Sequence, residues 1–509
     1  MRFLRVSSYA LSAATIFLGA FLLFAIQPIV GKQLLPYFGG SSSVWATSLF
    51  FFTTTLFLGY LYVYVITKFS PLIQRTIHLC LIAVAGLFVL GLSIFSNGLL
   101  VALNLGDGAP ALEVFLSLAL SIGVPYFLLS TTAPLIQYWY GTAKGKEPYS
   151  LYALSNAASL LALLSYPFVI EPLVQLRHQR GAWAVLFSVY AFACVASALS
   201  IFRMRKHSPE TSQSIAEPPI LREIVLWTLF AALPSFTLVA TTTELTQTIA
   251  PVPLLWIVPL ALYLITFVIA FRARGKSIFT PLLFLISSCS AWWFISAGHD
   301  KIVPQVLSYL LLLFFCSLSC HVLLYRMRPR LRSLPLFYLF LSLGGAVGVL
   351  AAGIIAPLVF PDYWEFPLGV AFSIALAIWI LPVSFFPRIL DTHRILITKL
   401  IFILIVISVF FRFFVGEEEM PAIETRNFYG NAEVVFRTEA TLLMNGTTLH
   451  GMQSTDNAEV RLPTTYYTPG SGIGRALIYA RGAQGGGPIN VGVVGLGTGT
   501  IAAYCAPDD

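Results

Sequence analysis

The sequence predicts an all-α polytopic membrane bundle followed by a small, incomplete α/β segment. Of the 509 residues, 58% are hydrophobic and only 10% are charged, whereas charged residues make up about 25% of ordinary soluble domains. Apolar runs of about 20 residues, the length that crosses a ~30 Å hydrocarbon layer, recur along residues 1–415. That part carries 25 Lys/Arg and 12 Asp/Glu, and residues 416–509 carry 5 and 10. These observations exclude a soluble globular protein and separate a basic membrane part from an acidic tail.

The membrane part is predicted to hold about 13 spans. They lie near residues 8–30, 43–67, 74–95, 111–139, 150–173, 180–202, 222–246, 250–271, 278–298, 304–325, 334–360, 364–386 and 395–415. Gln27-Pro28 is expected to end the first span. Prolines inside the fourth and fifth spans free backbone carbonyls that lipid cannot satisfy, so we expect these spans to face other helices. No internal sequence repeat marks paired halves.

The longest polar interruption, residues 203–221, is predicted to be a cytoplasmic linker. It separates a first half of six spans (1–202) from a second half (222–415) that has one span more. With the N-terminus in the cytoplasm, the cytoplasmic segments hold 20 Lys/Arg and the opposite side holds 5, which supports this orientation. An odd number of spans then places residues 416–509 outside the cytoplasm. The first apolar run is too long for a typical signal peptide, so we expect it to be retained.

Charge and cysteine patterns argue against a nucleic-acid interface and against a disulfide framework or metal site. The basic residues flank apolar runs in short clusters, as topology signals do, and this argues against a nucleic-acid partner. Five of the six cysteines lie inside apolar stretches. The sequence therefore predicts no disulfide framework and no metal site.

The tail has the alternating pattern of short strands. Ala432–Phe436 and Ala440–Met444 are predicted strands. Asn445-Gly446, followed by Thr447–Gln453, is a strong hairpin signal.

A glycine run follows a predicted short buried strand, Val491–Val494, and precedes the helix-like Ile501–Tyr504. Gly495, Gly497 and Gly499 would let the backbone approach a ligand at a helix N-terminus. Their spacing favours an S-adenosylmethionine-type ligand over NAD, and a simple tight turn is the alternative. The acidic residue that binds a ribose is expected about 20 residues further on, so we expect the cofactor fold to be incomplete in this sequence.

Several separated motifs resemble the bacterial fused MFS/spermidine synthase family, whose members are multi-pass proteins of the bacterial inner membrane. In the tail they are Arg426–Gly430, Asn445–Gln453, Pro463–Tyr467 and Val491–Tyr504. In the membrane part they are Leu151–Asn156, Ser165–Phe168, Glu171-Pro172, Thr243-Glu244, Ala250–Trp256, Phe337-Tyr338 and Gly344-Gly345. The resemblance implies MFS-like halves and an aminopropyltransferase-like tail with a β-hairpin region and the start of a Rossmann-like fold.

The resemblance also implies a ligand set. Decarboxylated S-adenosylmethionine would bind at the three glycines and Gln453, and a polyamine would bind near Tyr467, with His450 as a further contact. The carboxylate that accepts the proton of the attacking amine would lie beyond the glycine run. The catalytic residue is therefore unknown, and we expect the sequence as given to lack activity.

Three ionisable residues lie in or at the edges of the predicted spans: Glu171, Glu244 and His321. Ionisable groups are costly there and often mark a cation or proton path. The alternative is that the two glutamates lie at the membrane interface and His321 bonds a neighbouring group.

Three functions follow from these patterns. The first is a membrane spermidine synthase-like protein of doubtful activity. The second is a transporter or sensor of polyamines or other small amines, with the tail as a lid. The third is a structural subunit that binds a partner protein through its tail.

Overall fold

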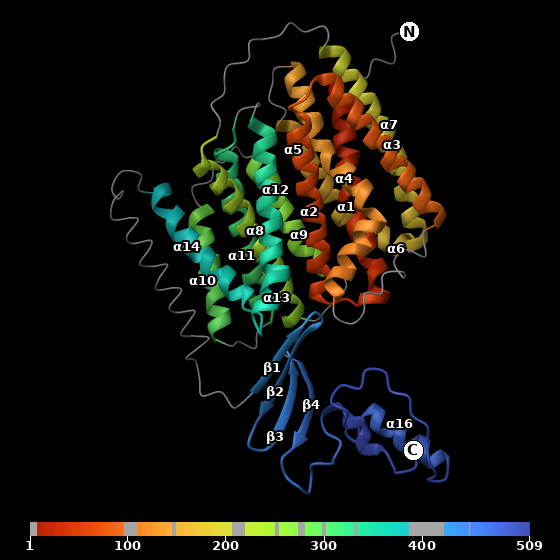
Figure 1. The fold of residues 1–509 in the computed structure, drawn as a ribbon. Helices are drawn as coiled ribbons and strands as arrows, with labels where there is room; N and C mark the ends of the chain where they lie inside the picture. The colour runs from red at the N-terminus through yellow and green to blue at the C-terminus, as the bar shows by residue number, and fades with distance from the viewer. Residues whose placement is uncertain are drawn as a thin grey trace.

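A computed structural model describes residues 8–95, 109–144, 149–205, 219–249, 254–272, 280–297, 302–329, 333–385, 422–446 and 448–509. It shows a helical bundle with a small sheet at one end (Figure 1). Within these ranges, nine helices are long and apolar enough to cross a membrane, and three shorter apolar helices accompany them. The twelve coincide with the first twelve predicted spans, so the polytopic helical bundle is confirmed. The predicted span near residues 395–415 lies outside the described residues.

The first six spans form what we call the N-terminal half. They are α1 (Ser8–Phe38), α2 (Ser42–Ile66), α3 (Pro71–Phe95), α4 (Pro110–Lys144), the fifth span of α5 (Tyr149–Ser165), the π-helix η1 (Tyr166–Ile170) and α6 (Glu171–Leu173), and α7 (Leu176–Arg205). Pro125 and Pro134 of α4 are buried, as expected for a span that faces other helices. In contrast to the prediction, α1 continues past Pro28. A proline inside a helix removes one hydrogen bond and does not always end the helix.

The next six spans form the C-terminal half. They are α8 (Leu221–Thr248), α9 (Ile257–Arg272), α10 (Thr280–Ala297), α11 (Ile302–Arg326), the span of α12 (Leu334–Leu350), the π-helix η3 (Ala351–Ile355) and α13 (Ala356–Val359), and α14 (Glu365–Phe385). The fifth span of each half is therefore a long helix, a π-helical turn and a short helix in the same order.

Equivalent spans pack in the same way in the two halves. In both, the first span contacts the fourth and fifth, the second contacts the fourth, and the third contacts the fourth and sixth. The halves meet where α2 packs on α12 and α5 packs on α9. Each of these contacts joins the second span of one half to the fifth span of the other, so exchanging the halves converts one contact into the other. The helix contacts therefore show a structural repeat that the sequence does not reveal.

Two glycines allow the closest approach inside the C-terminal half. A Cβ atom at Gly344 of α12 would lie 2.3 Å from the carbonyl oxygen of Thr228, and one at Gly348 would lie 2.2 Å from that of Ala232. Real Cβ atoms do not approach so closely. Only glycine permits this packing of α12 on α8.

The tail begins with a four-stranded antiparallel sheet in the order β1 (Ala422–Asn427), β2 (Gly430–Phe436), β3 (Ala440–Asn445), β4 (Thr448–Ser454). The predicted strands β2 and β3 and the hairpin at Asn445-Gly446 are confirmed, and Gly446 has the positive φ of 53° that such a turn requires. Three described elements of the tail were not predicted: β1, the 3-10 helix η4 (Thr465–Tyr467) and the helix α16 (Gly472–Ala483). Ser471 caps α16 through the amide of Gly474 at 3.1 Å.

The predicted strand at Val491–Val494 does not form, and the segment after the glycine run is the short 3-10 helix η5 (Thr500–Tyr504). A buried parallel strand needs a hydrogen-bonded neighbour, and the described sheet contains only β1 to β4. The side chain of Val494 is accordingly fully exposed. The Rossmann-like part of the prediction has no support in the structure.

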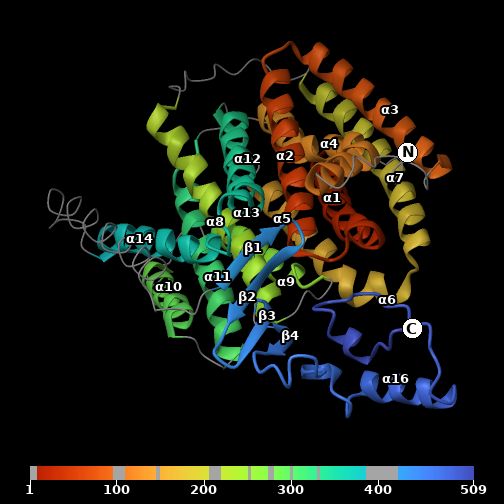
Figure 2. The same cartoon turned by 60° about the horizontal axis from the view of Figure 1, so that its bottom comes forward.

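The sheet lies at the end of the bundle where α8 ends and α14 begins, and we call this the sheet end (Figures 1 and 2). Its turn at Gly446 is next to Gln247 of α8. Ser8, at the start of α1, bonds Ser200 near the end of α7 at the opposite end, here called the far end. The first described residue and the sheet therefore lie at opposite ends of the bundle.

Candidate functional site

A cavity of about 170 Å³, which we call the central cavity, lies between the two halves. Spans α1, α2, α4 and α5 form one wall, and α8, α9 and α12 form the other. One buried water occupies roughly 10–15 Å³ of cavity volume measured in this way. The central cavity therefore has room for about a dozen waters, or for one small solute in their place.

Aromatic rings and uncharged polar groups line the central cavity. The aromatic residues are Phe24, Phe52, Tyr60, Tyr126, Tyr152, Tyr263 and Phe267, and the polar ones include Gln27, Thr53, Ser130, Thr132, Ser155, Asn156, Ser159, Ser235 and Ser342. Among the described lining residues there is no Asp, Glu, Lys, Arg or His. Because an unpaired buried charge is costly, these walls favour an uncharged ligand.

Gln27 provides a specific polar contact in this wall. Its side chain is 3% exposed, and its amide Nε2 donates to the hydroxyl of Tyr126 at 3.2 Å. Its Oε1 atom has no hydrogen-bond partner within the described part of the protein. A buried acceptor without a partner is destabilising, so Oε1 is available to accept a hydrogen bond from a ligand or a water in the cavity.

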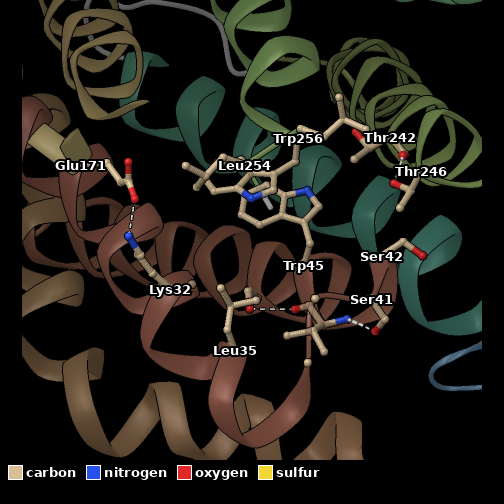
Figure 3. Close-up of a pocket in the computed structure, with 16 residues that line it drawn as sticks. Lys32, Leu35, Ser41, Ser42, Trp45, Glu171, Thr242, Thr246, Leu254 and Trp256 are labelled. Atoms are coloured by element: carbon tan, nitrogen blue, oxygen red, sulfur yellow. Dashed lines mark hydrogen bonds and ion pairs between the residues drawn. The ribbon is translucent and has the colours of Figure 1, made fainter. Parts of the chain in front are cut away.

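A pair of stacked tryptophans crosses between the halves on the sheet side of the cavity. The rings of Trp45 in α2 and Trp256, just before α9, lie 3.6 Å apart with planes at 13°. Each lies one helical turn before a lining residue, Leu49 and Leu260 respectively. Beyond the tryptophans, a smaller cavity of about 110 Å³ is lined by Thr242 and Thr246 among others (Figure 3).

A second aromatic cluster crosses between the halves on the far side of the cavity. The rings of Tyr152 in α5 and Tyr338 in α12 stack at 5.6 Å, and Tyr152 also lies 4.4 Å from Phe271 of α9. Tyr60 of α2 completes the cluster at 6.1 Å from Tyr338. One aromatic residue thus comes from each of the four spans through which the halves meet. The central cavity lies between two layers of interfacial aromatic contacts.

The three ionisable residues predicted within the spans lie apart from one another, and none lines the central cavity. Glu171 forms an ion pair with Lys32 at the smaller cavity. Glu244 is half-buried near the end of α8, within electrostatic range of acidic residues in the segment from α13 to α14. His321 is fully buried, with Nδ1 2.8 Å from the hydroxyl of Thr266 and its ring stacked 3.5 Å from that of Phe267. The predicted cation or proton path remains a prediction.

The structure brings the predicted tail residues together only in part. Gln453 and Gly499 line one groove of about 740 Å³ between the sheet and η5. The hydroxyl of Tyr467 lies 3.7 Å from the position of a Cβ at Gly497. The backbone oxygen of His450 accepts a hydrogen bond from the hydroxyl of Tyr466 at 2.7 Å.

The described residues of this tail groove lack two features of the predicted adenosyl site. Gly495, Gly497 and Gly499 all have positive φ, so the turn itself forms. However, η5 has five residues and is not an α-helix, and no carboxylate occurs among the described residues that line the groove. The described residues of the groove therefore supply neither an α-helix N-terminus nor a lining carboxylate that could accept a proton. Decarboxylated S-adenosylmethionine and polyamine remain predictions for this groove.

Comparison with known proteins leaves the chain unassigned. No protein-family model matches the sequence, and no curated protein matches it. Among solved structures, the chain is similar to the inward-open conformation of the xylose transporter XylE from E. coli, at 13% sequence identity and a TM-score of 0.45 over 74% of this chain and 95% of that chain. The likeness is too distant to assign a family or a substrate.

Proposed function

We propose that this protein is a membrane transporter that moves a small, uncharged polar solute by alternating access. The main support is the position of the central cavity. It lies between two structurally equivalent halves, and interfacial aromatic contacts lie on both sides of it. Rocking of one half against the other would separate one aromatic layer and keep the other closed. Many transporters built from repeats move in this way about a site at the repeat interface.

The cavity lining supports the choice of solute. The unpaired acceptor of Gln27 and the surrounding hydroxyl groups would bind hydrogen-bond donors and acceptors, and the rings would pack on an apolar face. A polyamine would bring two or more positive charges to walls whose described residues include no carboxylate, and an unpaired buried charge is strongly unfavourable. An uncharged solute therefore suits the cavity better than the amines that the sequence led us to consider.

The distribution of charge supports an orientation for the transporter. Lys68, Arg75, Lys144 and Arg222 lie at far-end helix termini, whereas Lys32, Arg177 and Arg180 lie at the sheet end. Cytoplasmic ends of membrane proteins carry the excess of Lys and Arg. We infer that the far end faces the cytoplasm and that the sheet lies outside, in a bacterial inner membrane.

Uptake into proteoliposomes tests the transport proposal. Labelled uncharged polyols and amides would be compared with labelled putrescine and spermidine. We expect accumulation of an uncharged member, reduced about tenfold by Gln27→Leu because one buried hydrogen bond is worth about 1–3 kcal/mol when a partner is left unpaired. Gln305→Leu, the same change in α11 outside the cavity lining, should keep wild-type uptake.

Two results would contradict the proposal in different ways. Accumulation of the polyamines alone would overturn the uncharged solute and leave transport standing. Failure of every panel member to accumulate, together with no change in their binding upon Gln27→Leu, would overturn the assignment of the central cavity as a transport site.

A further inference from the structure

The turn between β1 and β2 is anchored to the C-terminal half through a buried ion pair. The guanidinium of Arg426 binds both carboxylate oxygens of Glu365 at the start of α14, at 2.7 and 3.1 Å. The two side chains are only 4% and 1% exposed. Arg426 also donates to the backbone oxygen of Asp362 at 2.7 Å. Paired, planar bonds of this kind fix orientation as well as contributing energy.

Neighbouring contacts strengthen this anchor. The Arg426 guanidinium lies 4.3 Å from the ring centre of Tyr363, and the amide of Asn431 donates to the Asp362 carboxylate at 3.0 Å. Burial raises the pKa of Tyr363 to about 12, so its ring is neutral at physiological pH. A neutral aromatic face attracts the guanidinium. The turn between β3 and β4 makes a second contact, because a Cβ at Gly446 would lie 3.0 Å from the Oε1 of Gln247 in α8.

Phe428, in the anchored turn, makes an apolar contact with the bundle. Its half-buried ring packs against the hydrophobic core cluster that includes Trp45. Most described members of this cluster lie in helices of the N-terminal half, and nine lie in the C-terminal half. Leu254 and Trp256 pack against the same cluster. The turn is therefore bound to one half through Arg426 and touches, through Phe428, the core that carries the sheet-end tryptophan pair.

We propose that the turn between β1 and β2 is a lock that holds the sheet end of the transporter closed. This inference builds on the proposed alternating-access function. Opening the sheet end would separate Trp45 from Trp256 and move the N-terminal half away from the sheet, which Arg426 keeps on α14. Phe428 would then lose its packing on the N-terminal members of this hydrophobic core cluster in the open state only. A contact present in one of two states shifts their equilibrium by its own free energy.

The proposed lock predicts that substitution of Phe428 changes the distance between the two halves at the sheet end. Spin labels would be attached through Tyr37→Cys at the end of α1 and Ile249→Cys after α8, both exposed positions. The exposed cysteines Cys80, Cys289 and Cys505 would be replaced by serine in the full chain. Double electron–electron resonance then measures the populations of closed and open sheet ends without a known substrate. We expect one dominant short distance in the parent protein.

Phe428→Ala is expected to increase the longer-distance population at least threefold. Ile423→Ala, a change in β1 at a side chain that is 60% exposed, should leave the distribution unaltered. Arg426→Lys, which keeps the charge and loses the paired geometry, should shift it in the same direction as Phe428→Ala. Identical distributions for Phe428→Ala and Ile423→Ala would overturn the lock.

The outcome also separates the lock from the proposed function. If labelled solutes accumulate but Phe428→Ala leaves the distances unaltered, the protein transports and the lock is wrong. If nothing accumulates and Gln27→Leu changes no binding, but the distances respond, the lock stands as a conformational contact and the transport proposal is wrong.

Discussion

The central cavity and the tail groove differ in how their walls are built. Seven spans line the central cavity, and its contacts join residues that are far apart in the chain, such as Gln27 and Tyr126. The tail groove lies between a sheet of four consecutive strands and a five-residue helix. Of its predicted site residues, Gln453 and Gly499 line the groove, and no carboxylate does so among the described residues.

The comparison shows that a recognisable sequence motif does not by itself form a binding site. In the tail, the glycine turn forms with the expected backbone conformation, but the strand and helix that would make it a nucleotide cradle do not form around it. In the bundle, no short motif marks the cavity, and the packing of repeated halves creates it. The central cavity therefore supports a functional proposal better than the glycine turn does.

The largest expected effect tests whether close helix packing maintains the cavity. Gly348→Val would place a Cβ 2.2 Å from the carbonyl oxygen of Ala232 in α8, and overpacking of this kind costs about 1–3 kcal/mol or more. We expect most of the protein to be lost from the monodisperse peak in size-exclusion chromatography, with a lower melting temperature for the remainder. In Gly345→Ala the new Cβ would meet only the Ser235 hydroxyl at an ordinary 3.7 Å, and recovery should match wild type.

A matching change in the tail groove completes this test. A Cβ at Gly499 would meet nothing within 4 Å, although its φ of +75° disfavours alanine. Gly499→Ala should therefore strain the turn locally and leave the yield and melting temperature of the bundle unaltered. A bundle that tolerated Gly348→Val as well as Gly499→Ala would remove the distinction drawn between the two regions.

An effect of intermediate size is expected on solute uptake, measured in two single variants, one in each region. Tyr152→Leu removes the ring that stacks on Tyr338 and contacts Phe271 at the far end. Because this layer joins the halves, we expect accumulation of an uncharged solute in proteoliposomes to fall about tenfold, as for a loss of about 1.4 kcal/mol. Gln453→Ala in the tail groove should keep uptake within twofold of wild type. Equal losses for both variants would show that the groove takes part in transport.

The sequence predicted the features that depend on local patterns. Twelve described spans follow from apolar length, and β2, β3 and the turn at Gly446 follow from alternation and turn chemistry. Gln27 was interpreted as a helix end because it precedes Pro28, whereas α1 continues and its amide lies in the cavity wall. A polar residue inside an apolar run was the available signal.

Long-range contacts could not be predicted in this way. The ion pair of Arg426 and Glu365 joins residues that are 61 positions apart, and the pairing of α2 with α12 joins opposite ends of the membrane part. Neither leaves a periodic trace in one sequence. The equivalence of the halves is a property of helix contacts and π-helical turns, so it became visible only in three dimensions.

The smallest expected effect is a loss of local stability at low pH, which we expect in the tail and not in the spans that line the central cavity. Hydrogen bonds from Arg481, and then from the backbone amides of Ala506 and Ile489, hold the pKa of Asp509 well below its ordinary value. A carboxylate with a lowered pKa stabilises the fold above its ordinary pKa of about 4, and that stabilisation is lost as the pH falls through the lowered value. The described lining of the central cavity has no such group.

Hydrogen exchange along α16, corrected for intrinsic rates, measures this difference. Protection of residues 472–483 should be constant from pH 7 to about pH 4 and should fall below that, whereas the spans that line the cavity should keep theirs. At pH 7, Asp509→Asn should weaken protection of α16 two- to threefold, because the neutral amide loses the charged contact with Arg481 on that helix. Asp508→Asn, at the exposed neighbour, should have no effect. If both substitutions behaved alike, the acid sensitivity of the tail would have to come from groups other than Asp509.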